Sequence, residues 1–152
     1  MLPLFRSKDE LMSREEKDRL IQSIKVLEQR TSGEIRIYIE GSCPAADAMS
    51  RCKELFLHLN MQKTSYRNAV LLYIATHDRK FAIFGDQGIY EKAGPEFWQQ
   101  KGALLAEHLR NGAYAKGIEM CIHDIGNSLA EFFPPASEIK NELPDDIVFG
   151  KF

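Results

Sequence analysis

The residues that decide the fold are "AVLLYIATHDRKFAIF", Ala69 to Phe84. The first seven residues of this stretch, 69–75, form an unbroken apolar run. Such a run is typical of a strand that is covered on both faces, so we place it at the centre of a sheet. The four polar residues 76–79 make a turn before a second short strand over 80–84. Two strands joined by so short a turn predict an antiparallel hairpin.

Upstream of the hairpin, the sequence predicts a helix, a strand and a second helix. The first helix, over 13–31, begins with the capping-box spacing of Ser13 and Glu16. The strand lies over 34–40, where isoleucines alternate with polar residues in "EIRIYIE". The second helix starts near Asp47 and continues to about Leu59, with apolar residues at helical spacing.

Downstream of the hairpin, the sequence predicts two more helices. Pro95 suits the first position of one helix, which the pair Asn111-Gly112 ends. The other helix covers 113–132, before two consecutive prolines. The resulting order, α-β-α-β-β-α-α, predicts an α/β (α+β mixed) fold in which a small mixed β-sheet is sandwiched between helices. We expect about four α-helices and three to four strands, and the strand order stays open.

The chain of 152 residues has the size of one domain. We divide it into an N-terminal extension, 1–12, a domain, 13–134, and an acidic C-terminal tail, 135–152. The apolar residues Ile147, Val148 and Phe149 of this tail are expected to dock back on the domain.

Composition excludes several function classes. The net charge of -2 argues against a nucleic-acid-binding protein that relies on an overall positive field. The sequence shows no signal peptide and no apolar run long enough for a membrane span, so we expect a soluble, cytoplasmic protein. Three cysteines without a CxxC pair indicate neither a zinc knuckle nor a disulfide framework.

The loop "GDQG", 85–88, is the strongest candidate for a functional site. Glycine-rich turns can cradle phosphate with their N–H groups, but Asp86 and Glu91 bring negative charge here, which opposes an anion. Carboxylate oxygens on a turn suit a hard cation such as calcium. A plain turn uses the same residue types, and that interpretation stays open.

Topology indicates which residues could join this loop. In a hairpin, Asn68 lies at the same edge of the sheet as Gly85 and Asp86. If the strand 34–40 runs parallel to 80–84, its last residue, Glu40, reaches that edge as well, at the carboxyl ends where open sheets usually bind ligands. The candidate metal site therefore consists of Asp86, Glu91, Asn68 and Glu40, with Asp86 ranked first. Each of the other three has a structural alternative. Glu40 could be a solvated strand end, Asn68 a turn residue and Glu91 a surface charge.

Three segments carry a resemblance to a known family: "TSGEIRIYIE" (31–40), "RNAVLLYIATHDRKFAIFGDQGIYEKAGPEFW" (67–98) and "NELPDDIVFG" (141–150). Together they resemble the TPM domain, which a thylakoid-lumen phosphatase-like protein and a photosystem II repair factor share with many bacterial proteins. The resemblance implies a mixed sheet between helices and a groove beside Asn68 and the 85–91 loop. It also implies calcium or other divalent ions at an acidic groove, as in some members, and the acid phosphatase activity attributed to the plant protein.

Three functions follow as hypotheses. The first is a module for interaction or assembly with an unknown protein partner that binds calcium, or magnesium or another divalent cation. The second is a weak metal-assisted acid phosphatase, in which the cation polarises a phosphoryl oxygen of a phosphomonoester. The third is a metal-free protein-binding domain. The sequence places no histidine, lysine or arginine to bind phosphate, which favours the first, and it identifies no catalytic residue.

Overall fold

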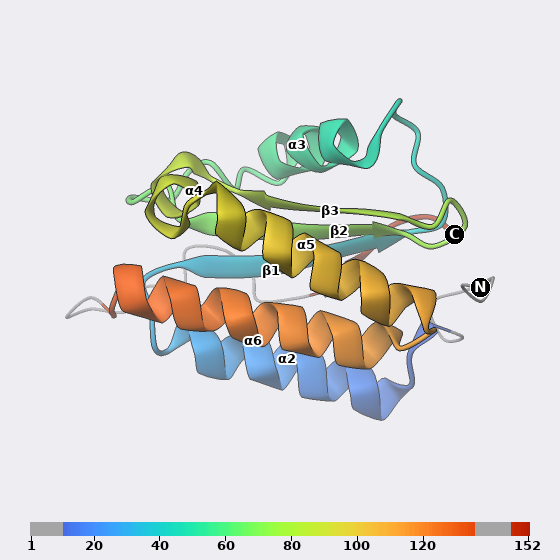
Figure 1. Ribbon diagram of the computed structural model, residues 1–152, viewed down its shortest axis with the longest axis horizontal. Helices are drawn as coiled ribbons and strands as arrows, with labels where there is room; N and C mark the ends of the chain where they lie inside the picture. The colour runs from blue at the N-terminus through green and yellow to red at the C-terminus, as the bar shows by residue number, and fades with distance from the viewer. Residues whose placement is uncertain (1–10, 136–146) are drawn as a thin grey trace.

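The computed structural model describes residues 11–135 and 147–152. In this part of the chain, one four-stranded sheet lies between layers of helices (Figure 1). The strands are β1 (Glu34–Glu40), β2 (Ala69–Ala75), β3 (Lys80–Gly85) and β4 (Ile147–Phe149). The helices are α2 (Arg14–Glu28), α3 (Ala48–His58), α4 (Gln87–Ala93), α5 (Pro95–Arg110) and α6 (Tyr114–Phe132).

The sheet has the strand order β3-β2-β1-β4. Strands β2 and β3 form the predicted antiparallel hairpin, in register from Val70 opposite Gly85 to Ala75 opposite Lys80. Every residue of β2 is buried, as the unbroken apolar run predicts. Strand β1 pairs in parallel with both β2 and β4. The fold is therefore α/β with one mixed sheet.

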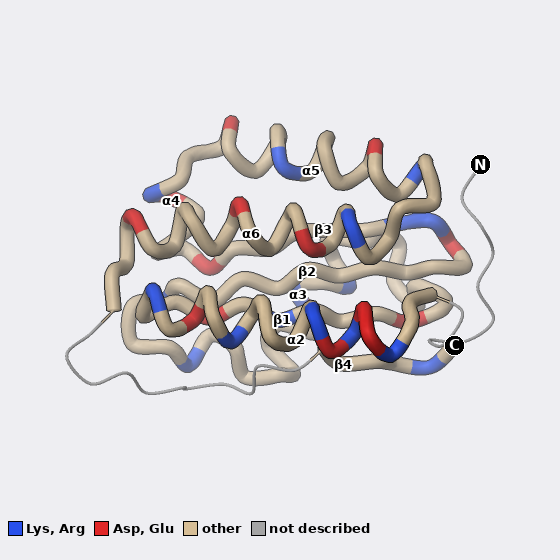
Figure 2. The backbone as a smooth tube through the Cα atoms, turned by 90° about the horizontal axis from the view of Figure 1, so that it is seen from below, with Lys and Arg blue, Asp and Glu red and all other residues tan. Residues whose placement is uncertain are grey.

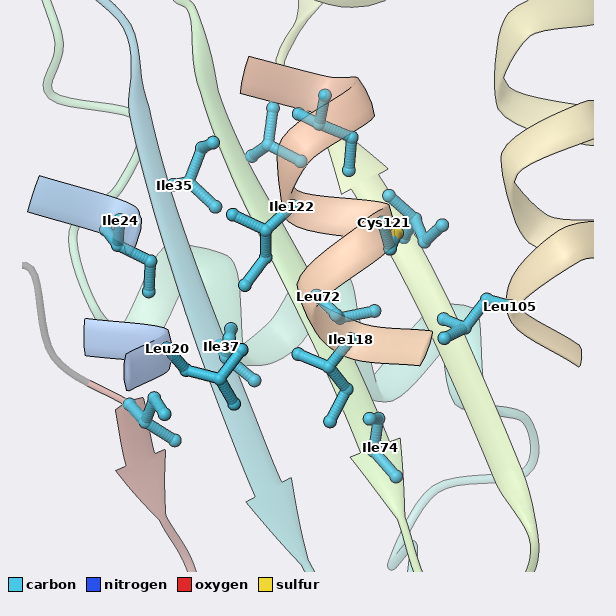
Figure 3. Close-up of a cluster of buried hydrophobic side chains, with 14 of the residues drawn as sticks. Leu20, Ile24, Ile35, Ile37, Leu72, Ile74, Leu105, Ile118, Cys121 and Ile122 are labelled. Carbon is cyan, nitrogen blue, oxygen red and sulfur yellow. The ribbon is translucent and has the colours of Figure 1, made fainter. Parts of the chain in front are cut away.

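Helices cover both faces of the sheet, with α3 on one face and α2, α5 and α6 on the other (Figure 1). Alternate residues of β1 and β2 point toward α6, and Figure 3 shows this larger core cluster. The cluster includes Ile35, Ile37, Leu72, Ile74, Ile118 and Ile122. A smaller cluster under α3 contains Cys52, Phe56, Leu71 and Tyr73.

The described residues contain five helices, one more than the sequence predicts. The additional helix is α4, which occupies residues that we interpreted as a turn before the helix at Pro95. Asp86 caps its first turn, and Ile89 anchors it in the core. Gly94, with a φ of 84°, then separates α4 from α5. A buried anchor and a side-chain cap thus stabilise a helix too short to show a clear sequence period.

The tail contributes a strand to the sheet. Ile147 pairs with Ile37 and Phe149 with Ile39, in parallel. Residues 1–10 of the predicted extension and 136–146 of the predicted tail lie outside the described residues. No helix within 11–135 or 147–152 is long and apolar enough to cross a membrane.

Candidate functional site

The two glycines of the candidate loop serve close packing. A Cβ on Gly85 would lie 2.7 Å from the Trp98 ring, and a Cβ on Gly88 would lie 2.2 Å from the carbonyl oxygen of Tyr66. The N–H groups of the loop are also engaged, since that of Gly88 donates to the Arg67 carbonyl at 2.8 Å. The loop therefore holds α4 against the turn at 66–67, and this geometry does not form a phosphate cradle.

Asp86 forms a two-pronged ion pair with Arg67. Arg67 Nε lies 2.6 Å from Asp86 Oδ2, and Arg67 Nη2 lies 2.8 Å from Asp86 Oδ1. The Asp86 side chain is only 4% exposed, whereas that of Arg67 is 42% exposed. The hydrogen bonds to Asp86 raise the pKa of Arg67 above its ordinary value. A buried carboxylate is thus neutralised by an arginine that reaches it from the surface.

A groove of about 490 Å³ opens beside this ion pair, and we call it the Asp86 groove. Its wall is lined from α3, the turn at 67, β3 and α4. The lining residues are Met49, Lys53, Arg67, Ile83, Phe84, Gly85, Asp86, Gln87, Tyr90 and Glu91. Two positive and two negative side chains line this groove. The predicted site residues Asp86 and Glu91 therefore share one surface.

Asn68 lies at the same sheet edge as Asp86, as the hairpin predicts, but its side chain points elsewhere. Its Nδ2 donates to Ser32 Oγ at 3.3 Å, in the loop between α2 and β1. The residue is fully buried, and its Oδ1 has no hydrogen-bond partner within the described part of the chain. Asn68 does not line the Asp86 groove.

The placement of Glu40 beside Asp86 is wrong. Strand β1 is parallel to β2, and β3 is antiparallel to β2, so β1 and β3 run in opposite directions. Glu40 pairs with Ala75 at one edge of the sheet, while the N–H of Asp86 donates to the carbonyl of Ala69 at the other. The condition on which we placed Glu40 in the site, a parallel arrangement of 34–40 and 80–84, is not met.

Glu40 belongs instead to a buried polar network. Arg51 Nε donates to its Oε2 at 2.9 Å, Arg51 Nη2 donates to its Oε1 at 3.1 Å, and the Tyr73 hydroxyl donates to Oε2. Burial, with the Glu40 hydrogen bond as a further cause, raises the pKa of Tyr73 far above its ordinary value. The carboxylate oxygens are therefore engaged with α3 and β2, and Glu40 anchors α3 to the sheet.

Sequence reasoning missed the two cations of the Asp86 groove, Lys53 and Arg67. A signal for Arg67 was present, because it directly precedes Asn68, which the hairpin places at the Asp86 edge. Lys53 comes from α3, and its side chain lies 5.9 Å from the centre of the Phe84 ring. Only the packing of α3 on the sheet brings Lys53 to the groove, so no sequence spacing indicates it.

The Asp86 groove offers oxygen ligands of the type that calcium binds, but fewer of them than calcium takes. Asp86 and Glu91 offer carboxylates and Gln87 an amide oxygen, and Gln87 and Glu91 are four apart on α4 and share a helix face. Calcium takes six to eight oxygen ligands. No group of three or more His, Cys, Asp or Glu side chains in the described residues could hold a metal ion. A calcium ion in this groove would therefore need water molecules for most of its coordination.

The comparison with protein families gives one match, to the TPM domain, over residues 6–128. The chain belongs to the TPM domain family. The match covers strands β1, β2 and β3 and the whole Asp86 groove, which lies within 49–91. The resemblance read from the sequence is thereby confirmed.

Solved structures agree with this TPM domain. The BA42 protein of the psychrophilic bacterium Bizionia argentinensis is 31% identical, with a TM-score of 0.86, over 96% of this chain and 100% of that one. The N-terminal domain of the cg2496 protein of Corynebacterium glutamicum has a TM-score of 0.60 over 93% of each chain. At 13% identity, this second likeness shows the fold alone. No curated protein sequence matches the chain.

Proposed function

We propose that this TPM domain is a binding module that holds a divalent cation, calcium first, in the Asp86 groove. The supporting observation is the Asp86 carboxylate, buried in the groove wall and neutralised by an arginine whose side chain is 42% exposed. Burying a carboxylate costs free energy unless a positive charge compensates it. Arg67 supplies that charge in the cation-free protein, and calcium can supply it in exchange.

The exchange determines how tightly the ion binds. Calcium must displace two hydrogen bonds from Arg67 and gains Asp86, Glu91 and Gln87 as oxygen ligands. Lys53 at the same groove opposes a further positive charge. Two carboxylates and an internal competitor therefore favour weak binding, with a Kd on the order of 10⁻⁴–10⁻³ M.

Release of Arg67 would couple calcium binding to the binding of a protein partner. Once calcium occupies Asp86, the guanidinium is free at the surface and lies at the same groove as Lys53. Two cations beside a bound metal ion suit an anionic group of a protein partner. The domain would then assemble with that partner in a calcium-dependent manner.

The same pair of cations supports a second candidate function, a weak phosphomonoesterase. A phosphoryl group could contact Arg67 and Lys53 while the metal ion polarises one of its oxygens. Hydrolysis of p-nitrophenyl phosphate distinguishes the two functions. The binding module predicts no turnover above the buffer rate. Turnover that disappears both with a chelator and in Asp86→Asn would assign the groove to an enzyme.

Calcium titration of the full chain, followed by amide NMR, tests the binding itself. We expect progressive shifts in residues 85–91 and in the side-chain Nε–H of Arg67, which leaves Asp86. Asp86→Asn should abolish these shifts. The matched control, Asp78→Asn, changes an aspartate at the opposite edge of the sheet, where it accepts the N–H of Cys43, and should keep them. Absence of shifts in the wild type at several millimolar calcium would rule out the cation.

A further inference from the structure

Helices α2 and α6 lie on the face of the sheet opposite α3 (Figure 1). A second groove, of about 680 Å³, lies between these two helices. We call it the α2–α6 groove. Its lining residues are Arg19, Gln22, Ser23, Val26, Leu27, Arg30, Lys116, Glu119, Met120, His123 and Asp124. The two helices lie side by side in both views (Figures 1 and 2). They run in parallel, since Arg19 pairs with Glu119 and Leu27 contacts Gly126 further along.

The centre of the α2–α6 groove is apolar and exposed. Val26 of α2 is 47% exposed and Met120 of α6 is 45% exposed, and both line the groove. Leu27 lies beneath them, where α2 approaches α6 so closely that a Cβ on Gly126 would lie 2.7 Å from its Cδ2. Two exposed apolar side chains from different helices thus border one hollow.

The charges around this centre are unbalanced. Glu119 is paired with Arg19 at 3.3 Å, and Asp124 is paired with Lys101 of α5 at 3.2 Å. Arg30 and Lys116 also line the groove, and neither forms an ion pair within 11–135 or 147–152. Because α2 and α6 are parallel, Lys116 lies toward the start of the groove and Arg30 toward its end. The groove is locally positive although the whole chain has a net charge of -2.

We propose that the α2–α6 groove binds an acidic amphipathic helix of about four turns from a partner protein. Its apolar side would cover Val26 and Met120, and acidic side chains near its two ends would pair with Lys116 and Arg30. Because Arg19 pairs with Glu119, Lys116 lies level with about residue 16 of α2. From there to Arg30 the groove is about 21 Å long at ~1.5 Å of rise per residue, which matches about four turns. An amphipathic helix laid in an apolar groove is a recurring mode of peptide recognition.

The inference is independent of the proposed cation site. The two grooves share no lining residue, and no helix lines both of them. Loss of calcium binding would leave the α2–α6 groove intact. A helix that fails to bind leaves the calcium titration unaffected, so the two failures can be told apart.

Selection of short helical peptides of varied charge and apolar spacing against the full chain tests the proposal. We expect the selected peptides to be acidic, with apolar residues at i, i+3 or i+4 and i+7, and to shift the methyl resonances of Val26 and Met120. Arg30→Glu combined with Lys116→Glu should weaken these peptides at least about tenfold, since charge pairs across an interface are lost and reversed. The control Lys25→Glu with Arg110→Glu reverses two exposed cations outside the groove and should leave affinity unchanged.

A second pair of variants tests the apolar part. Met120→Ala should weaken the selected peptides several-fold, whereas Leu104→Ala, equally exposed on α5, should not. Circular dichroism identical to that of the wild type shows that each variant is folded. Peptides without acidic bias, or acidic peptides whose binding survives the double charge reversal, would overturn the proposal. So would binding of this face to phosphatidylserine vesicles without any binding of acidic peptides.

Discussion

The carboxylate of Glu40 lies inside the protein with Arg51 as its counter-ion, and Arg51 also reaches the exposed Glu54 at 2.9 Å. Removing Arg51 leaves a buried charge without compensation, because Tyr73 donates only a neutral hydrogen bond. We expect Arg51→Ala to lower the free energy of unfolding by about 3–5 kcal/mol in urea denaturation. Glu54→Ala, which removes the outer partner, should change it by no more than about 0.5 kcal/mol. Equal effects of the two variants would show that the network is not buried in solution.

Two buried thiols should make the free energy of unfolding depend on pH. Burial raises the pKa of Cys52 and of Cys121 from 9.0 to about 12. The folded state therefore binds these protons more tightly, and the stability it gains is present below pH 9 and lost as the pH rises toward 12. Between about pH 8 and pH 10 the free energy of unfolding should fall by about 1 kcal/mol per thiol. The double variant Cys52→Ala/Cys121→Ala should lose this part of the slope, and Cys43→Ala should retain it.

Sequence reasoning at the residue scale identified Asp86 and Glu91 at one groove and missed what neutralises Asp86. The reason is physical, because residue types on a turn show which charges are available but not which counter-ion packing brings to them. Arg67 adopts a left-handed conformation, with a φ of 52°, just before β2, and its side chain then reaches Asp86. Sequence alone does not reveal that conformation, since it is rare in residues other than glycine, asparagine and aspartate.

At the scale of elements, the contact between α4 and the turn at 66–67 positions Arg67 beside Asp86. Gly88→Ala places a Cβ against the carbonyl oxygens of Tyr66 and Arg67, at 2.2 and 2.6 Å, and backbone atoms cannot easily move away. We expect a loss of about 1–3 kcal/mol in thermal or urea unfolding. Gly102→Ala is the control, since no atom lies within 4 Å of its Cβ in α5. That variant should gain about 0.5–1 kcal/mol from helix propensity. Stabilisation of both variants would contradict the close contact at Gly88.

Long or strongly patterned elements were predictable and short ones were not. The hairpin, β1 and the helices α2, α3, α5 and α6 all follow from apolar periodicity and end signals in the sequence. Helix α4 was missed because its seven residues carry one buried anchor, Ile89, and its Gly88 is of a type also common in turns. Packing of Tyr90 against Trp98 and of Gly88 against the 66–67 turn decides its conformation.

For the whole molecule, the α/β class and the mixed sheet between helices were predictable, but the predicted position of Glu40 assumed that β1 runs parallel to β3, and the two strands run in opposite directions. The order β1, α3, β2 is a strand–helix–strand unit, and such a connection usually joins parallel strands. With β2 and β3 antiparallel, this rule already sends Glu40 to the edge opposite Asp86. The remaining features, two grooves lined from different helices, depend on how the helices pack on the sheet, and no local sequence pattern encodes that.

Competition between calcium and Arg67 for Asp86 is tested by measuring the calcium Kd of Arg67→Gln and of the wild type under the same conditions. Removing the internal competitor should tighten calcium binding by about three- to tenfold, since a charge-assisted pair no longer has to be broken. Asp86→Asn serves as the reference without binding. An Arg67→Gln variant that binds calcium no more tightly than the wild type would contradict the exchange.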